Sequence, residues 1–163
     1  MNSASDSQEQ TAVLFICLGN ICRSPLAEGV FSALAEEHGV RDRFRIESAG
    51  TGAWHVGEPP DSRSTAVARQ HGIELIGTAR RVESEDLREF DYLIVMDRQN
   101  ERDIGHLLEL YGGEAALELL REYDSEAGSD LDVPDPYYGG PDGFDRVYRM
   151  VRRSCEGLLQ ALT

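Results

Sequence analysis

The sequence contains no lysine, few cysteines and no long apolar run. Its 16 basic residues are all arginine, and 30 acidic residues outnumber them, which gives a formal net charge of −14. So much negative charge repels nucleic-acid phosphates and anionic lipid headgroups, so no binding to nucleic acid is expected. The longest apolar run, residues 12–18, is much shorter than the roughly 20 residues that cross a bilayer, so no membrane insertion is expected.

Cysteine usage and the first residues indicate the compartment. Cys17, Cys22 and Cys155 are too few for a disulfide framework. No secretory signal is visible, because the first basic residue is Arg23 and no positive segment precedes an apolar stretch. We therefore expect a reducing, cytoplasmic setting. The length of 163 residues fits a single domain, and 40% hydrophobic and 28% charged residues are ordinary for a folded protein.

The pattern of apolar residues predicts where the chain folds. Residues 1–11 contain almost nothing to bury, so we expect a disordered tail there, followed by a domain over residues 12–163. Short apolar runs predict strands at 12–17 and 92–96, and a further strand is expected at 45–48. Helical periodicity predicts helices at 23–39, 62–71, 98–111 and 144–162, with a further short helix before residue 92.

Two kinds of segment complete this pattern. Ser62 and Ser84 are the expected helix caps. Residues 116–123 fit either a strand or a helix, and residues 124–141 are expected to form a long polar loop. Strands that alternate with helices are typical of a parallel sheet. We therefore expect one α/β domain of three layers, with a four-stranded parallel sheet flanked by helices and a phosphate-binding loop after the first strand.

The loop between the first strand and the first helix, residues 17–24, has the features of an anion site. Ligands of such sheets bind beyond the carboxyl ends of the strands, and a helix N-terminus favours negative charge. Gly19 and Asn20 tolerate the backbone angles that a tight cradle of N–H groups requires. Arg23 can hold a tetrahedral oxyanion through two hydrogen bonds. The expected phosphate-binding residues are Leu18, Gly19, Asn20, Ile21, Cys22, Arg23 and Ser24.

Cys17 lies at the base of this expected cradle. The features that bind an anion also stabilise a thiolate. A thiolate beneath a bound phosphate is a nucleophile aimed in line at phosphorus. Ser24 can donate a hydrogen bond to the sulfur when the sulfur becomes a leaving group. The residues themselves therefore favour phosphoryl transfer through cysteine.

The sequence CLGNICRSP at residues 17–25 resembles the phosphate-binding loop of the low-molecular-weight protein tyrosine phosphatases. The resemblance covers residues 12–162 and includes SAGT at 48–51 and DPYY at 135–138, in the order found in the family. It implies hydrolysis of phosphotyrosine in proteins.

The resemblance also implies catalytic roles. Cys17 resembles the nucleophile that becomes phosphocysteine, and Arg23 resembles the clamp on the phosphate oxygens. Asp135 resembles the general acid that protonates the leaving phenolate and then activates water, and such acid–base help is worth roughly 10²–10⁴ in rate. Without the resemblance, several neighbouring carboxylates are candidates for the acid, among them Asp124, Asp130 and Asp132.

Further positions match the family's supporting residues. The resemblance implies a polar network around the loop from Asn20, Ser24, Ser48 and His71. It implies aromatic walls that admit a phosphotyrosine ring from Trp54, Tyr137 and Tyr138. It also implies a protective disulfide between Cys17 and Cys22. From the residues alone, His71 is a helix-end residue stabilised by the helix dipole, and Cys22 is a small packing residue.

Other functions remain to be weighed. Protein-arginine phosphatases resemble this chain but tend to carry threonine where Ile21 stands. Arsenate reductases need further cysteines in a mobile segment, whereas Cys155 lies on the expected core face of the last helix. A non-catalytic phosphotyrosine-binding module would have lost Cys17, Arg23 or Asp135. A zinc site is disfavoured, because two cysteines separated by four residues, without a second pair, are not a usual zinc pattern.

The implied chemistry sets the expected partners. No metal and no cofactor are expected, because Arg23, the loop amides and the helix terminus can supply the positive field. The expected substrate is a phosphotyrosine-containing protein, which in bacterial relatives is often a tyrosine kinase. We expect the protein to act as a monomer.

Overall fold

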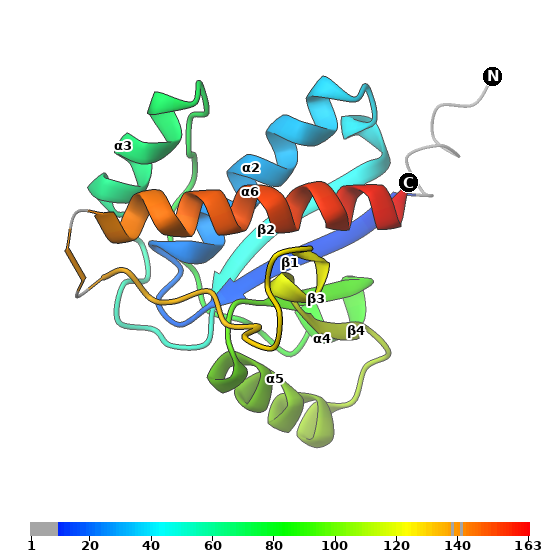
Figure 1. Cartoon of the computed structure of the whole chain (residues 1–163). Coiled ribbons are helices and arrows are strands. Elements are labelled where there is room, and N and C mark those ends of the chain that lie inside the picture. Colours follow the sequence, from blue (N-terminus) through cyan, green and yellow to red (C-terminus); the bar gives the residue numbers. More distant parts are fainter. Residues whose placement is uncertain (1–9, 138, 141) are drawn as a thin grey trace.

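The middle layer of the protein is a parallel sheet of four strands in the order β2-β1-β3-β4. The computed structural model in Figure 1 describes residues 10–137, 139–140 and 142–163. The strands are β1 (Thr11–Cys17), β2 (Phe44–Gly50), β3 (Tyr92–Val95) and β4 (Ala116–Leu119). The expectation of a single α/β domain with a four-stranded parallel sheet is confirmed.

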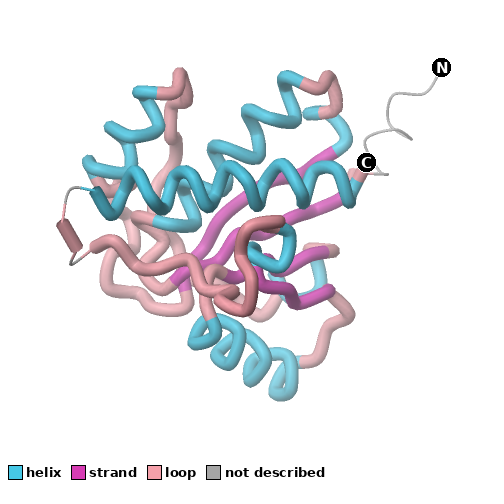
Figure 2. Tube along the Cα trace, viewed as in Figure 1, coloured by secondary structure: helices cyan, strands magenta, loops and turns pink. Residues whose placement is uncertain are grey.

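Helices cover both faces of the sheet (Figure 2). One face packs against α2 (Arg23–Glu37), α3 (Ser62–Gln70) and α6 (Asp142–Leu162). The other face packs against α4 (Asp86–Glu89) and α5 (Arg98–Tyr111). Two short 3-10 helices, η1 (Arg41–Arg43) and η2 (Leu120–Tyr123), complete the chain.

Strand β1 is the centre of the core. Its side chains alternate, so that Val13 and Phe15 face the α2 and α6 side while Leu14 and Ile16 face the α5 side. A strand covered on both faces needs a continuous apolar sequence, which is what residues 12–17 provide. Complete burial of such a side chain contributes roughly 1.5–3 kcal/mol. The carboxyl end of β1 is therefore held rigidly where the site begins.

Several element boundaries differ from the sequence-based expectation by one or two residues, and two of the helix caps differ as well. Strand β1 begins at Thr11, because that residue pairs with Phe44, and residues 1–9 of the expected tail lie outside the described residues. Asp61, not Ser62, caps α3, since its carboxylate accepts the Arg63 N–H at 2.8 Å. Ser84 gives no side-chain cap to α4, whose N-cap position is Glu85. The ambiguous segment 116–123 divides into a strand and a 3-10 helix.

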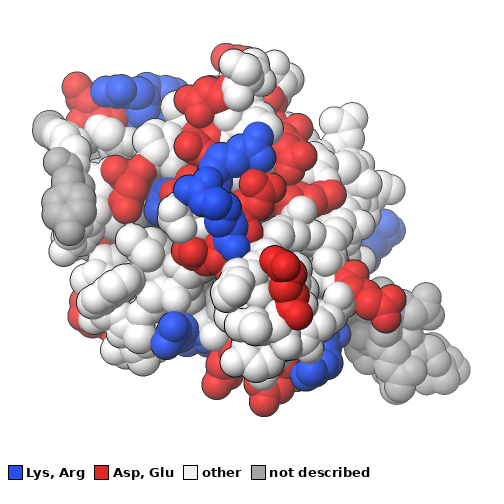
Figure 3. Space-filling view, turned by 90° about the horizontal axis from the view of Figure 1, so that it is seen from below, with Lys and Arg blue, Asp and Glu red and all other residues white. Residues whose placement is uncertain are grey.

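The surface is as acidic as the composition indicates. In Figure 3 acidic side chains are spread widely over the face in view, and arginines lie among them. Arginines on the surface pair with carboxylates, as Arg45 does with Glu47 at 2.8 Å. No helix in the described part of the chain combines the length and the apolar character needed to cross a membrane.

Candidate active site

The loop between β1 and α2 turns around the Cys17 sulfur. Asn20 has φ of 58°, a left-handed conformation that asparagine tolerates better than most residues. This turn directs the Asn20 N–H at the Cys17 sulfur, with 3.3 Å between nitrogen and sulfur. The Ser24 hydroxyl, in the first turn of α2, lies 3.0 Å from the same sulfur. Two polar groups therefore meet a cysteine that is almost completely buried.

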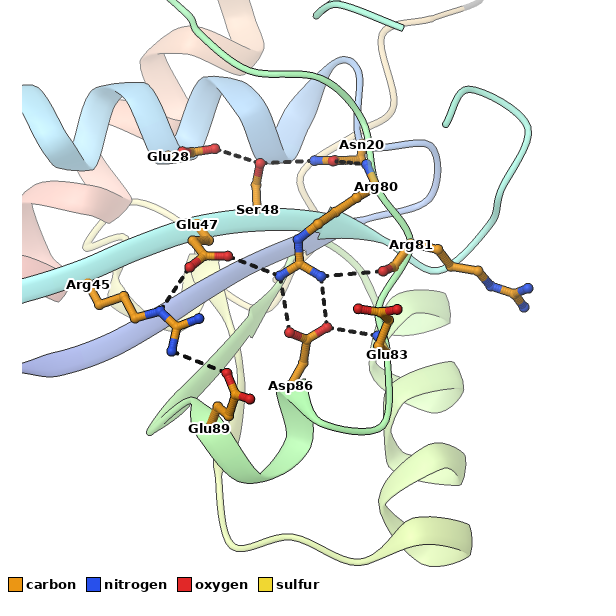
Figure 4. A network of polar contacts seen from close by, with 10 residues as sticks. All are labelled: Asn20, Glu28, Arg45, Glu47, Ser48, Arg80, Arg81, Glu83, Asp86 and Glu89. Atoms are coloured by element: carbon orange, nitrogen blue, oxygen red, sulfur yellow. Dashed lines mark hydrogen bonds and ion pairs between the residues drawn. The ribbon is translucent and has the colours of Figure 1, made fainter. Parts of the chain in front are cut away.

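The side chain of Asn20 links the phosphate-binding loop to neighbouring segments of the chain. Its amide donates hydrogen bonds to the Ser24 hydroxyl at 2.8 Å and to the Ser48 hydroxyl at 3.0 Å, and its oxygen accepts the Arg80 N–H at 3.0 Å. Ser48 in turn donates to the Glu28 carboxylate at 2.6 Å (Figure 4). Ser24 accepts from Asn20, and its hydroxyl lies within hydrogen-bond distance of both the Cys17 sulfur at 3.0 Å and the Ala49 carbonyl oxygen at 3.4 Å. The expected grouping of Asn20, Ser24 and Ser48 is present.

Charged residues extend this network away from the loop. The Arg80 guanidinium binds both carboxylate oxygens of Asp86 at 2.9 and 3.1 Å and contacts Glu47 at 3.2 Å (Figure 4). Asp86 also accepts the Glu83 N–H at 2.7 Å. Burial raises the pKa of Glu28, and its hydrogen bond with Ser48 only partly offsets that effect. Arg80, in the loop that follows α3, and Glu28 of α2 therefore help to hold the phosphate-binding loop, and neither role was predicted from the sequence.

His71, which the sequence analysis also assigned to this network, has no hydrogen bond to Asn20, Ser24 or Ser48 among the contacts of the described residues. It is exposed at the C-terminal end of α3, and its ring stacks on Tyr148 of α6 with 3.9 Å between centroids. The residues that complete the network are instead Glu28, through Ser48, and the Arg80 backbone N–H. His71 therefore lies at a helix end, as the pattern of the sequence predicted.

Arg23 joins three segments at the floor of the site. Its side chain is buried, with one nitrogen 2.6 Å from the Asp97 carboxylate and 2.9 Å from the Val133 carbonyl oxygen. Its other terminal nitrogen lies 3.6 Å from the Asp135 carboxylate. Burial opposes the charged guanidinium, but Cys17 and the ion pair with Asp97 outweigh burial and raise the pKa of Arg23. The arginine is therefore a fixed positive charge beside the cysteine.

A cavity of about 440 Å³ opens above this floor. The loop after β1 forms its base, and its walls are Trp54, His55, Asp135 and Tyr137. Trp54 is 73% exposed, so it forms part of the rim rather than the core. His55 lies so close to the loop that a side chain at Gly19 would meet its ring at 3.0 Å. The cavity can enclose a flat ring carrying a phosphate that reaches the loop.

Most of the site residues expected from the sequence meet at this cavity. Those that line it are Cys17, Leu18, Gly19, Ile21, Cys22, Arg23, Trp54, Asp135 and Tyr137. Tyr138 lies outside the described residues. The sequence analysis missed His55, and it missed Asp97, which is also the N-cap of α5. The position of Asp97 directly after a buried strand was the available signal.

Comparison with known proteins agrees with this geometry. The family model described as low molecular weight phosphotyrosine protein phosphatase matches residues 12–163. The chain belongs to this family. Among curated members, the low molecular weight protein-tyrosine-phosphatase YfkJ of Bacillus subtilis is 43% identical, over 93% of this chain and 95% of that protein. The low molecular weight phosphotyrosine protein phosphatase of Mus musculus is also 43% identical, over 91% of this chain and 94% of its own length.

Solved structures of two kinds of phosphatase are similar to this member of the family. A protein tyrosine phosphatase from Entamoeba histolytica has a TM-score of 0.86 and 35% identity, covering 94% of this chain and 97% of that chain. The Drosophila arginine phosphatase has a TM-score of 0.88 and 32% identity, covering 93% of this chain and 97% of that chain.

The three cysteines of this phosphatase chain are free thiols with different surroundings. Burial, reinforced by Asp61 and Cys17, raises the pKa of Cys22 to about 12. Cys155 is fully buried in α6, as its place on the apolar face predicts, and burial raises its pKa as well. Cys22 and Cys155 are therefore protonated at neutral pH. The disulfide between Cys17 and Cys22 stays a prediction.

Proposed function

We propose that this protein is a cysteine-dependent, metal-independent phosphatase that hydrolyses phosphotyrosine in proteins. One observation carries the proposal: the Cys17 sulfur, met by the Asn20 N–H and the Ser24 hydroxyl, lies at the floor of a cavity that also contains Arg23 and Asp135. Membership of the phosphotyrosine phosphatase family supports it.

In the first step the cysteine takes the phosphoryl group. The loop N–H groups and Arg23 bind the phosphate oxygens and stabilise the charge of the transition state. The Cys17 thiolate attacks phosphorus, so that the S–P bond forms while the P–O bond to the tyrosine ring breaks. Asp135, in its protonated form, donates its proton to the departing phenolate oxygen. The products of this step are tyrosine and phosphocysteine.

The second step returns the enzyme to its starting state. A water molecule attacks the phosphorus, and the Asp135 carboxylate accepts its proton. The S–P bond breaks, the thiolate leaves, and phosphate is released. The Ser24 hydroxyl, 3.0 Å from the sulfur, and the Asn20 N–H stabilise the thiolate as it leaves. Phosphate and vanadate are therefore expected to inhibit the enzyme.

The cavity walls favour an aromatic substrate. Ile21 gives the cavity an apolar side chain, and Tyr137 and Trp54 flank its opening. Aromatic side chains can stack on a phosphotyrosine ring. A phosphoserine side chain is too short to bring its phosphate to the loop through such walls.

Phosphoarginine is the second candidate substrate. The likeness to the Drosophila arginine phosphatase is what favours it, since that protein has the same fold with 32% identity. Ile21 argues against it, because a guanidinium phosphate suits a polar side chain at that position. We further propose that the enzyme works as a monomer in the cytoplasm, on a phosphotyrosine-bearing protein such as a bacterial tyrosine kinase.

The test is a comparison of initial rates on a phosphotyrosine peptide and on phosphoarginine, with EDTA present. Wild-type enzyme is expected to hydrolyse phosphotyrosine faster, and Cys17→Ser is expected to hydrolyse neither. Cys155→Ala, which changes a cysteine in the core outside the cavity, serves as the control and is expected to keep its activity. Faster hydrolysis of phosphoarginine would contradict the substrate, and turnover by Cys17→Ser would contradict the nucleophile.

A further inference from the structure

A buried group of charges lies at the start of the loop that leads to Asp135. Asp124 has a completely buried carboxylate, and two arginines reach it from different elements. Arg153 of α6 contacts its two oxygens at 2.9 and 3.2 Å, and Arg121 of η2 donates to it at 3.2 Å. Burial opposes ionisation of Asp124, but the arginines and the Glu126 N–H outweigh burial and lower its pKa. The carboxylate is therefore charged and fully satisfied.

Arg121 has further N–H donors beyond the one that binds Asp124, and one of them binds the loop that leads to Asp135. Its terminal nitrogen donates to the backbone carbonyl of Asp132 at 3.1 Å and lies 3.8 Å from the Asp130 carboxylate. Only 5% of the residue is exposed, so water does not compete freely for this bond. Arg153 has no such contact with Asp132 among the described hydrogen bonds. The two arginines therefore share Asp124 but differ in their hold on the loop.

The anchored carbonyl is three residues before the acid. The next residue, Val133, donates its N–H to the Met96 carbonyl at 2.7 Å and accepts from Arg23 at 2.9 Å. Pro134 follows, and its ring restricts the backbone. Asp135 comes next, with one carboxylate oxygen accepting the Tyr137 N–H at 3.1 Å. The Arg98 N–H also binds the Asp132 carboxylate at 3.0 Å, so the Asp132 carbonyl, the two bonds of Val133 and the proline ring together define the path of the chain into Asp135.

We infer that Arg121 is a positioning residue for Asp135, because it holds the Asp132 carbonyl and so sets where the acid-bearing segment begins. The inference rests on the proposed role of Asp135 as the general acid. A misplacement of about 1 Å at a reacting group can cost as much as about 10²-fold in rate. If Arg121 is lost, Arg153 still neutralises Asp124, so the fold persists while the Asp132 carbonyl loses its donor. The loss of activity should then appear only with substrates for which proton donation to the leaving group limits the rate.

The test compares kcat/KM for phenyl phosphate, a poor leaving group, and 4-nitrophenyl phosphate, a good one. This ratio of constants reports the reaction up to release of the leaving group. Arg121→Met is expected to lose about tenfold on phenyl phosphate and less than about twofold on 4-nitrophenyl phosphate. Arg121→Lys, which keeps the charge but has one donor nitrogen in place of three, is expected to lose only about threefold on phenyl phosphate.

Arg153→Met is the matched control, since it removes the other arginine from Asp124 and does not reach Asp132. We expect it to lower the melting temperature and to affect both substrates equally. Equal losses on both substrates for Arg121→Met, no loss at all, or the same substrate dependence in Arg153→Met would overturn the inference. If Arg121→Met does not fold, Arg121→Lys is judged against Arg153→Lys by the same criterion.

Failure of the proposed function would look different. A wild-type enzyme without phosphotyrosine hydrolysis, or an Asp135→Asn variant without leaving-group dependence, would refute the role of Asp135 itself. Normal behaviour of both, with no substrate-dependent loss in the Arg121 variants, would refute only the positioning role.

Discussion

Arg23 donates a hydrogen bond to the Val133 carbonyl at 2.9 Å, so the proposed phosphate clamp also holds the segment that carries the proposed acid. The same guanidinium nitrogen contacts Asp97 at 2.6 Å. The loop that carries Cys17, the segment after β3 and the loop that carries Asp135 therefore meet at the buried Arg23 guanidinium. This arrangement explains why residues far apart in the sequence can be held in one reactive geometry.

Asp97 is a residue whose change should affect activity and stability through two different contacts. Its carboxylate caps α5 by accepting the Asn100 N–H at 2.8 Å and also pairs with Arg23. Asp97→Asn keeps a good cap but turns an amide donor toward Arg23. We expect kcat/KM to fall about tenfold, and the melting temperature to fall as well, because the buried Arg23 loses its charged partner. Asp97→Ala should lose more stability than Asp97→Asn, because the cap contributes about a further 1 kcal/mol. Wild-type kcat/KM in Asp97→Asn would contradict this account of Arg23.

The acid role of Asp135 predicts a dependence on the leaving group. Asp135→Asn cannot protonate a phenolate, so kcat/KM for phenyl phosphate should fall by about 10² or more. The loss for 4-nitrophenyl phosphate should be much smaller, because that phenolate leaves readily without a proton. Measuring kcat/KM for a series of aryl phosphates gives the dependence of the rate on the leaving group directly. Parallel losses over the whole series would argue against an acid at this position.

Glu28 predicts a pH dependence of stability. Burial raises its pKa above the ordinary 4.5, so the folded protein binds its proton more tightly than the unfolded chain. Its contribution to stability is complete below pH 4.5 and is lost as pH rises through the raised pKa of the folded state. Glu28→Gln can still accept from Ser48, so the variant should gain stability relative to wild type as pH rises toward neutral. Urea unfolding of both proteins between pH 4 and 8 checks this, and a constant difference would rule it out.

The three cysteines should differ in reactivity. Burial raises the pKa of Cys22 to about 12 and also raises that of Cys155, so both remain thiols at neutral pH. Since the thiolate is the reactive form, iodoacetate should modify Cys17 first, and bound phosphate should slow that reaction. Peptide mapping after brief alkylation measures the extent of modification at each of the three cysteines. Modification of Cys22 at the same rate as Cys17 would contradict the assignment.

Local patterns in the sequence predicted most of the fold. The apolar run at 12–17 and the single apolar face of the last helix each correspond to one element, because burial decides both. Helix caps were less predictable. Asp61 and Ser62 are both good caps, and only the hydrogen bond to Arg63 distinguishes them.

The site was predictable where one loop supplies it and not where distant segments meet. Residues 17–24 are continuous, so their chemistry could be recognised from composition and spacing. Arg80 reaches Asn20 across 60 residues of sequence, and Asp97 reaches Arg23 across 74. The contact of His71 with Tyr148 was not predictable for the same reason, since a position at a helix end does not indicate which neighbour the ring contacts. Such partners are fixed by topology and packing, which a local pattern does not contain.

The central claim is that Cys17 carries the phosphoryl group, and trapping that intermediate tests it most directly. Asp135→Asn with 4-nitrophenyl phosphate should form phosphocysteine readily but hydrolyse it slowly, because no base activates the water. After an acid quench, the tryptic peptide of residues 1–23 is fragmented, since no basic residue before Arg23 separates Cys17 from Cys22. We predict one phosphoryl group on Cys17, and none in the variant that also carries Cys17→Ser. A phosphoryl group on Cys22 or on any other residue, or hydrolysis with no trapped intermediate, would contradict the mechanism.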